Sequence, residues 1–309
     1  MFYLSRICDR FKLGLGRVSL GDKTLNDFRH IPRKRFGQHW LTDQSVLDQI
    51  VKAAKLSSDD CVLEVGPGKG ALTEKLIESQ AGFIQAIELD RDLVVGLKKR
   101  FSHNNKFSLR EGDILSAPLD AENGQIINKV VANIPYNITG PILKRLIGEL
   151  GKAPENNFET LVLLMQKEVA QRILSLPGNS NFSALSVRIQ LLAKCQDVCD
   201  VPSRCFTPAP KVDSKVVLIK PFRARDQRDV DIGRLLEKLL KLAFSGRRKK
   251  LRNTIGSFVT SSDQVKEFLA HRGISLDQRP QEISPSNWFD LAKALKETSV
   301  IKNGSFQSK

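Results

Sequence analysis

A strand that runs directly into a glycine-rich turn and then into a helix constrains this chain more than any other feature. Residues 61–65 read Cys-Val-Leu-Glu-Val, an apolar run typical of a buried parallel strand. Residues 66–70 read Gly-Pro-Gly-Lys-Gly, and residues 71–77 have helical spacing. This order forms the first unit of a doubly wound α/β domain, in which glycines let a ligand approach the backbone closely. We therefore predict an open, mostly parallel sheet between layers of helices.

The glycine spacing separates three kinds of ligand loop. A Walker phosphate loop needs Gly-Lys followed by Ser or Thr, but Lys69 is followed by Gly70. The dinucleotide fingerprint G-x-G-x-x-G would have its third glycine one residue later. The shortened loop, with Pro67, is similar to the methyl-donor loop of S-adenosylmethionine enzymes. S-adenosylmethionine is therefore the expected cofactor, held at Gly66 and Gly68.

Two acidic residues follow later strands of the predicted sheet. Glu88 ends the apolar run 83–88, about 20 residues after the first glycine, where a carboxylate can accept from both hydroxyls of a ribose. Asp113 follows the run 107–111 and is placed to accept from an adenine amino group. The alternative for Asp113 is an ordinary turn aspartate.

Residues 133–137, Asn-Ile-Pro-Tyr-Asn, follow the apolar run 129–132, the fourth predicted strand, and precede a helix. Ligands bind at the carboxyl ends of strands in such sheets, so this segment lies at the predicted site. Asn133 offers an acceptor oxygen, Pro135 fixes the direction of nearby carbonyls, and Tyr136 offers a flat face. This set suits the exocyclic amino group of a purine. The alternative is a tight turn with an exposed Tyr136.

Phe206 begins a proline-rich loop, residues 206–214. Such a residue is placed to clamp a flipped base opposite Tyr136. The alternative is a core phenylalanine at the base of a loop.

Positive charge is concentrated at the two ends of the chain. The net charge is +15, with +6 in residues 1–40, +8 in residues 221–309 and +1 between them. This distribution indicates a catalytic centre flanked by regions that bind a polyanion. The cations predicted to contact the phosphates of this polyanion are Arg33, Lys34, Arg35, Arg247, Arg248, Lys249, Lys250 and Arg252.

We expect four regions along the chain. A basic, disordered arm covers residues 1–30, and the methyltransferase domain covers residues 31–222. A helical RNA-binding domain covers residues 223–297, and a disordered tail covers residues 298–309. No apolar run of about 18 residues predicts a membrane span. Five cysteines without framework spacing favour a reducing, cytoplasmic compartment, and we expect no metal site.

Taken in order, the motifs resemble those of the KsgA family of ribosomal RNA adenine dimethyltransferases, from about Arg33 to Ala294. The residues that carry this resemblance are RFGQHWL (35–41), EVGPGKGALT (64–73), ELD (88–90), GD (112–113), NIPYNIT (133–139), MQKEVA (165–170), FTPAPKVDS (206–214) and FSGRRKKLRN (244–253). One departure concerns the segment His39-Trp40-Leu41, because the family usually has Asn-Phe-Leu there.

The resemblance implies a Rossmann-like class I methyltransferase domain with a smaller all-α C-terminal domain. It also implies dimethylation of N6 of two adjacent adenines, in a hairpin near the 3′ end of 16S rRNA within the 30S particle, by a monomer. The family's cofactor contacts map onto His39, Leu41, Gly66, Glu88, Asp113 and Asn133. In the implied mechanism, Asn133 Oδ1 and the Pro135 carbonyl accept from N6, while Tyr136 and Phe206 hold the two faces of the base. No nucleophile or metal is required.

Three other functions compete with this interpretation. A related resistance-type enzyme methylates adenine in large-subunit rRNA, and the basic segment 247–253 argues against it. A non-catalytic rRNA-binding assembly factor is the second, and the intact segment 133–136 argues against that. A dehydrogenase is the generic third possibility for a glycine-rich doubly wound fold.

Overall fold

The computed structural model describes residues 38–297 except 154, 223–226, 247 and 260–262. The expected arm at 1–30 and tail at 298–309 lie outside the described residues. So do four of the predicted RNA contacts, Arg33, Lys34, Arg35 and Arg247.

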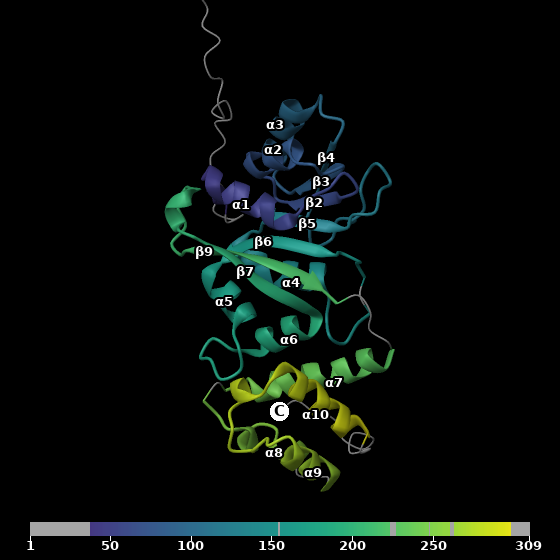
Figure 1. Ribbon diagram of the computed structural model, residues 1–309, viewed down its shortest axis with the longest axis vertical. Helices are drawn as coiled ribbons and strands as arrows, with labels where there is room; N and C mark the ends of the chain where they lie inside the picture. The colour runs from purple at the N-terminus through teal and green to yellow at the C-terminus, as the bar shows by residue number, and fades with distance from the viewer. Residues whose placement is uncertain (1–37, 154, 223–226, 247, 260–262, 298–309) are drawn as a thin grey trace, which may run out of the picture. The chain divides into compact units, whose positions relative to one another are not determined.

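A seven-stranded sheet in the order β4-β3-β2-β5-β6-β9-β7 forms the centre of the fold (Figure 1). The five strands from β4 to β6 are parallel, and β9 and β7 extend the sheet in antiparallel fashion. The chain order reverses between β2 and β5, so the ligand crevice of an open α/β sheet is expected at the carboxyl ends of these two strands. The bounds are β2 Cys61–Val65, β3 Phe83–Glu88, β4 Phe107–Glu111, β5 Lys129–Asn133, β6 Thr160–Gln166, β7 Ala193–Val201 and β9 Ser214–Pro221.

Two short strands lie outside the main sheet. β1 (Trp40–Leu41) pairs antiparallel with β8 (Phe206–Thr207), with Trp40 opposite Thr207 and Leu41 opposite Phe206. The N–H of Thr42 continues this pairing with a bond of 2.9 Å to the Cys205 carbonyl. The pairing brings the residues before α1 against the proline-rich loop, although about 165 residues separate them in sequence.

Alternate residues of the buried strands enter two different cores, as the pleat of a strand requires. Val62 packs with α1 and α2 on one face, whereas Leu63 packs with α4, α5 and α6 on the other. α3 covers β3 and β4 on the first face. The bounds are α1 Gln44–Ala54, α2 Ala71–Glu78, α3 Arg91–Phe101, α4 Thr139–Ile147, α5 Lys167–Leu174 and α6 Ala184–Leu192.

The C-terminal helices share a continuous apolar core with one face of the sheet. Leu236 in α7 (Gln227–Ala243) and Trp288 in α10 (Pro285–Glu297) belong to the same buried cluster as Leu63. Figure 1 shows α7 and α10 beneath α6, with α8 (Gly256–Val259) and α9 (Asp263–His271) beyond them. The division of the described chain at residue 222 stays a prediction, and any such boundary runs through this shared core.

The basic segment continues into a 3-10 turn, Leu251–Asn253, and only then into the helix α8. The N–H groups of Leu251 and Arg252 donate to the carbonyls of Gln278 and Leu276, both at 2.9 Å. This backbone pairing ties the basic segment to the loop after α9, so a regular helix begins only after it.

We expect Gly233→Ala to destabilise the protein by at least about 2 kcal/mol. Alanine normally stabilises a helix interior relative to glycine by about 1 kcal/mol. Here, however, a Cβ on Gly233 in α7 would lie 2.0 Å from the Leu150 carbonyl oxygen, so the helix would have to move. Denaturant unfolding measures the effect. Gly140→Ala in α4 is the matched control, because a Cβ there meets no atom within 4 Å. Equal stabilities for the two variants would contradict close packing of α7 on this segment.

Candidate active site

The glycine-rich turn between β2 and α2 leaves open space at its first residue. Gly66 has φ +64°, and a Cβ there would meet no atom within 4 Å. Gly68 has φ +59°, and a Cβ there would lie 2.7 Å from the Trp40 ring. Lys69 Nζ lies 4.3 Å from the centroid of that ring. The turn therefore exposes its backbone at Gly66 and is braced by Trp40 at Gly68.

Glu88, at the end of β3, lies directly against this turn. Its Oε2 accepts from the Gly68 N–H at 3.1 Å, and its Oε1 accepts from the Asp90 N–H at 2.9 Å. Burial raises the pKa of Glu88, and the backbone donors partly oppose this rise. Each carboxylate oxygen has more than one lone pair, so the side chain is held in place and can still accept from a ligand hydroxyl.

Asp113 lies at the carboxyl end of the neighbouring strand, β4. Its Oδ1 accepts from the Leu115 N–H at 2.9 Å, and its backbone carbonyl accepts from the N–H groups of Ser116 and Ala117. The side chain is half-buried. Asp113 therefore forms the turn that its alternative interpretation expects. It also lies at the carboxyl ends of the strands, where the adenine contact was predicted.

A buried carboxyl group beside the turn, that of Glu64, was not among the predicted site residues. Glu64 in β2 is 1% exposed, and neither of its carboxylate oxygens has a hydrogen-bond partner among the described residues. The Thr73 hydroxyl in α2 lies near it without meeting hydrogen-bond geometry, and it too is buried and unpaired within the described part of the chain. Burial raises the pKa of Glu64 to about 8, and the negative charge of Glu88 adds to the rise.

We expect Glu64→Gln to stabilise the ligand-free protein at pH 8, by on the order of 3 kcal/mol. Folding raises the pKa of Glu64 from 4.5 to about 8, so the wild-type protein loses stability as the pH rises through this window. The advantage of glutamine should therefore shrink to nothing as the pH falls to about 4.5. Denaturant unfolding at several pH values measures it. Glu78→Gln, at the exposed end of α2, is the control, and a matching pH dependence there would refute the assignment.

Asn133 ends β5, and the amide of its side chain is oriented by the chain before α1. Its Nδ2 donates to the His39 carbonyl at 3.1 Å. The Oδ1 atom is therefore the group directed away from this contact, as an acceptor for a ligand requires. His39 and Asn133, both predicted cofactor contacts, are brought together here.

Tyr136 lies on a short 3-10 turn after β5, with its hydroxyl 2.5 Å from Ser214 Oγ. Its ring stacks on His39, with centroids 5.8 Å apart and planes at 23°. Pro135, whose carbonyl is a predicted acceptor for N6, precedes Tyr136 in this turn. Its carbonyl already accepts from the Ile138 N–H at 3.4 Å and from the Thr139 hydroxyl at 3.3 Å, because it is part of the turn that begins α4.

Phe206 is 3% exposed and packs in the apolar cluster of α1, together with Leu41 and Val201. This burial is what the alternative of a core phenylalanine expects. The predicted role of Phe206 as a wall for the base stays a prediction. The side chain of Leu41, a predicted cofactor contact, is 4% exposed in the same cluster.

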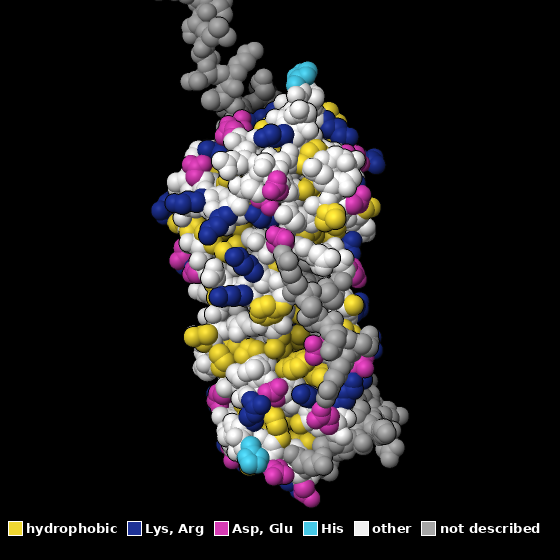
Figure 2. Space-filling model, turned by 45° about the vertical axis from the view of Figure 1, so that its right-hand side comes forward, with side chains coloured by type: hydrophobic (Ala, Val, Ile, Leu, Met, Phe, Trp, Pro, Cys, Tyr) yellow, Lys and Arg dark blue, Asp and Glu magenta, His cyan; other side chains and the backbone are white. Residues whose placement is uncertain are grey.

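The positive charge of the predicted RNA contacts at 248–252 is partly neutralised. Asp277 forms ion pairs with Lys250 Nζ at 3.2 Å and with Arg252 at 2.7 Å. Arg248 and Lys249 are exposed. Figure 2 shows Lys and Arg side chains spread over one face of the molecule, with Asp and Glu among them. The described members of the cluster therefore differ in how much charge they can offer to RNA.

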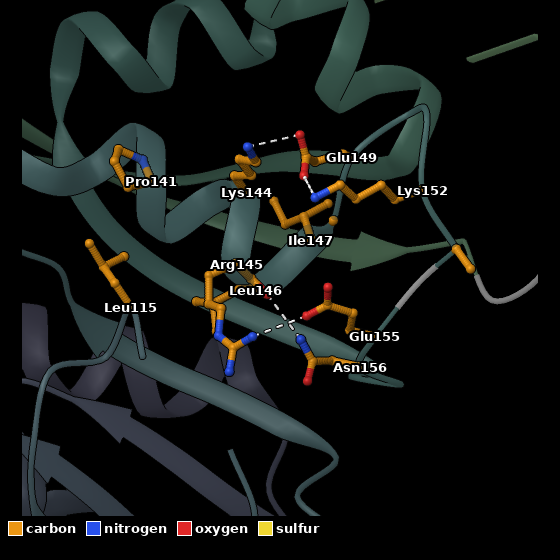
Figure 3. Close-up of a pocket in the computed structure, with 12 residues that line it drawn as sticks. Leu115, Pro141, Lys144, Arg145, Leu146, Ile147, Glu149, Lys152, Glu155 and Asn156 are labelled. Carbon is orange, nitrogen blue, oxygen red and sulfur yellow. Dashed lines mark hydrogen bonds and ion pairs between the residues drawn. The ribbon is translucent and has the colours of Figure 1, made fainter. Parts of the chain in front are cut away.

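A pocket of about 280 Å³ lies at the C-terminal end of α4 (Figure 3). Its cations are paired internally. Glu149 binds Lys144 and Lys152, each at 2.9 Å, and Glu155 binds Arg145 at 3.0 Å. The pocket therefore offers little uncompensated charge, and none of the predicted site residues lines it.

Among the residues that the structure describes, no group of three His, Cys, Asp or Glu side chains is arranged to hold a metal ion. Within the same residues, no helix is both long and apolar enough to span a membrane.

Comparison with known proteins agrees with this geometry. Residues 29–297 match the family described as ribosomal RNA adenine dimethylase. The chain is 85% identical over 289 residues to ribosomal RNA small subunit methyltransferase A of Prochlorococcus marinus strain NATL1A, covering 94% of this chain and 99% of that protein. The corresponding protein of Synechococcus sp. strain CC9902 is 60% identical over 269 residues, covering 87% of this chain and 97% of that protein.

Two solved structures are similar over most of the chain. A dimethyladenosine transferase from Plasmodium falciparum matches with a TM-score of 0.68 and 28% identity, covering 84% of this chain and 98% of that one. The 23S rRNA methyltransferase ErmE matches with a TM-score of 0.64 and 26% identity, covering 83% of this chain and 99% of that one.

The parallel sheet with its antiparallel edge, the open glycine turn and the acids at successive strand ends define a class I methyltransferase that uses S-adenosylmethionine. The fold class predicted from the sequence is thus confirmed. Within this class, the chain belongs to the ribosomal RNA adenine dimethylase family and is an rRNA adenine N6,N6-dimethyltransferase. The resemblance to the KsgA family is confirmed as well.

Proposed function

We propose that this enzyme dimethylates N6 of two adjacent adenines in a hairpin near the 3′ end of 16S rRNA, in the 30S particle or its precursor. The observation that carries this choice of substrate is the 85% identity with a protein named small subunit methyltransferase A, over 94% of the chain. We further propose that it acts as a monomer in the cytoplasm, without a metal.

The residues around the glycine turn fit S-adenosylmethionine. Glu88 is the acceptor for ribose hydroxyls and Asp113 for the adenine amino group. The unpaired, buried carboxyl of Glu64 suits the cationic amino group of the methionine part, because a buried polar group without a partner is costly. When bound, S-adenosylmethionine supplies an electrophilic methyl group on a sulfonium.

Asn133 and its neighbours position the substrate amino group. Asn133 Oδ1 accepts one N6 hydrogen, and the carbonyl of Ile134 is the second acceptor, because the Pro135 carbonyl is used within its own turn. Tyr136 supports the base by stacking. Accepting both hydrogens draws the N6 lone pair out of conjugation with the ring and directs it toward the methyl group. Catalysis thus consists of positioning and electrostatics, and water takes the N6 proton.

The test uses immature 30S and 50S particles from a strain that lacks the enzyme. The purified protein and labelled S-adenosylmethionine should produce two adjacent N6,N6-dimethyladenines in 16S rRNA, identified by mass spectrometry of its fragments. Label confined to 23S rRNA would overturn the choice of substrate. Absence of label in both particles would favour the non-catalytic binding factor.

The large-subunit enzyme remains the second candidate because ErmE, a 23S rRNA methyltransferase, has a similar fold with a TM-score of 0.64. Methyl transfer to naked 23S rRNA in competition with 30S particles distinguishes the two functions. We expect the 30S particle to take nearly all of the label.

A further inference from the structure

The hydroxyl of Tyr136 is engaged inside the protein, although the residue itself lies at the site. Its Oη lies 2.5 Å from Ser214 Oγ, and Ser214 is 0% exposed. Tyr136 as a whole is only half-buried. The hydroxyl therefore points inward, to a residue that water does not reach, while Tyr136 still presents surface to a ligand. Stacking needs the ring alone, so the hydroxyl requires a separate explanation.

Ser214 is a fixed point of the fold. It begins β9 and lies in register with Gln166 of β6 on one side and Val201 of β7 on the other. The residue before it is held as well, because the Asp213 carbonyl accepts from the Lys167 N–H at 3.0 Å. Two neighbouring strands thus determine where the Ser214 hydroxyl lies.

Tyr136, in contrast, begins a 3-10 turn of three residues, Tyr136–Ile138. An aromatic side chain on such a turn can rotate about its side-chain torsions unless something holds it. The hydrogen bond to Ser214 holds the far end of the ring and so restricts that rotation. A stacking surface that is oriented in advance loses less conformational freedom when a base arrives.

The phenol is poorly suited to take the N6 proton. Burial raises the pKa of Tyr136 above its ordinary value, and the hydrogen bond with Ser214 opposes part of the rise. The phenol is therefore neutral near neutral pH, because its ordinary pKa is already about 10. We propose that Ser214 is a positioning residue for methyl transfer, which anchors the Tyr136 hydroxyl and thereby orients the ring that supports the flipped adenine. This inference rests on the proposed stacking role of Tyr136.

Two substitutions break this hydrogen bond from opposite ends. Ser214→Ala removes the anchor, and Tyr136→Phe removes only the phenol oxygen and keeps the ring. Each should lower the single-turnover rate at saturating 30S particles by about tenfold, because a loosely held ring orients the base poorly. The double variant should be slower than either single variant by no more than about twofold, since both remove one interaction. KM for 30S particles should change by less than about threefold, because phosphate contacts supply most of the affinity.

Ser186→Ala is the matched control. Ser186 in α6 is also 0% exposed, and its hydroxyl donates to the Arg172 carbonyl at 2.5 Å, but neither residue is among the site residues. Its replacement removes a buried serine hydroxyl of the same kind, so thermal melting shows what that loss costs in stability. Below the melting temperature of every variant, Ser186→Ala should transfer methyl groups at the wild-type rate.

NMR of the tyrosine rings tests the contact itself. The chain has two tyrosines, Tyr3 and Tyr136, so isotopic labelling of the ring carbon that bears the hydroxyl gives two resonances, and Tyr136→Phe identifies one of them. Ser214→Ala should shift the Tyr136 resonance, and Ser186→Ala should not.

A wild-type rate for either single variant would overturn the inference, as would additive losses in the double variant or an unshifted Tyr136 resonance. Tyr136→Phe keeps the test decisive if Ser214→Ala does not fold. If the wild-type enzyme does not methylate 30S particles, the proposed function itself has failed, whereas the resonance still reports whether Ser214 anchors Tyr136.

Discussion

Replacing Asn133 with alanine should lower the rate of methyl transfer at saturating 30S particles and S-adenosylmethionine by at least about a hundredfold. The carbonyl oxygen of this side chain is directed away from His39, because the amide nitrogen is bonded to the His39 carbonyl at 3.1 Å. Removing it leaves N6 conjugated with the purine ring and poorly aimed at the methyl group. The loss should appear in kcat, since the interaction strengthens as charge develops on N6.

Single-turnover transfer of labelled methyl groups measures this rate, and filter binding of 30S particles measures affinity separately. Affinity should change by less than about threefold, because phosphate contacts supply most of it. Asn137→Ala is the matched control, as Asn137 is an exposed residue of the same loop. A near-normal rate for Asn133→Ala would show that the amino group is positioned by other residues.

Three strands could be predicted closely from the sequence, because β2, β3 and β4 have the bounds that the sequence indicates. β2 and β3 are buried along their whole length and are mostly apolar, as strands covered on both faces are. β4, at one edge of the sheet, alternates apolar Phe107 and Leu109 with polar residues.

β7 (Ala193–Val201) was missed. It lies at the other edge of the sheet, and its exposed Lys194, Gln196 and Asp197 look like loop residues in sequence. Edge strands carry such charges because they discourage pairing with other chains.

The residues at strand ends could also be located, because topology alone brings Glu88, Asp113 and Asn133 to one edge of the sheet. Phe206 and His39 could not. Their positions depend on β1 pairing with β8, two strands of two residues each, far apart in sequence. In that register, Phe206 lies opposite the buried Leu41 and enters the core. A short pairing of this kind leaves no periodicity to detect.

Glu64 did leave a signal, as the single acid within an apolar run that predicts a fully buried strand. A carboxyl group in such a strand must be neutral, paired or part of a ligand site. The ion pairs of Asp277 with Lys250 and Arg252 left no such signal in the sequence. Asp277 lies in a loop 25 residues after Arg252, and only the backbone pairing of the two segments joins them.

Neutralising Arg248 and Lys249 together, each to Gln, should reduce the steepness of the salt dependence of 30S binding. Each phosphate contact contributes about 0.7 to 0.9 to the slope of log K against log salt concentration. Both side chains are exposed, so the pair should lower the slope by about 1.5. Neutralising Lys250 should have a smaller effect, because Asp277 already balances part of its charge at 3.2 Å.

Filter binding between 50 and 300 mM salt, concentrations within the range where counterion release dominates, gives the slope for each variant. The matched control is Lys98→Gln with Lys99→Gln, which removes the same charge from exposed positions on α3. Figure 1 shows α3 and the C-terminal helices at opposite ends of the described fold. If RNA phosphates contact the C-terminal segment, only the first pair changes the slope, and binding of wild type and variant converges at high salt. Equal slopes for the two pairs would mean that net charge alone attracts the RNA, and would place its phosphates away from Arg248 and Lys249.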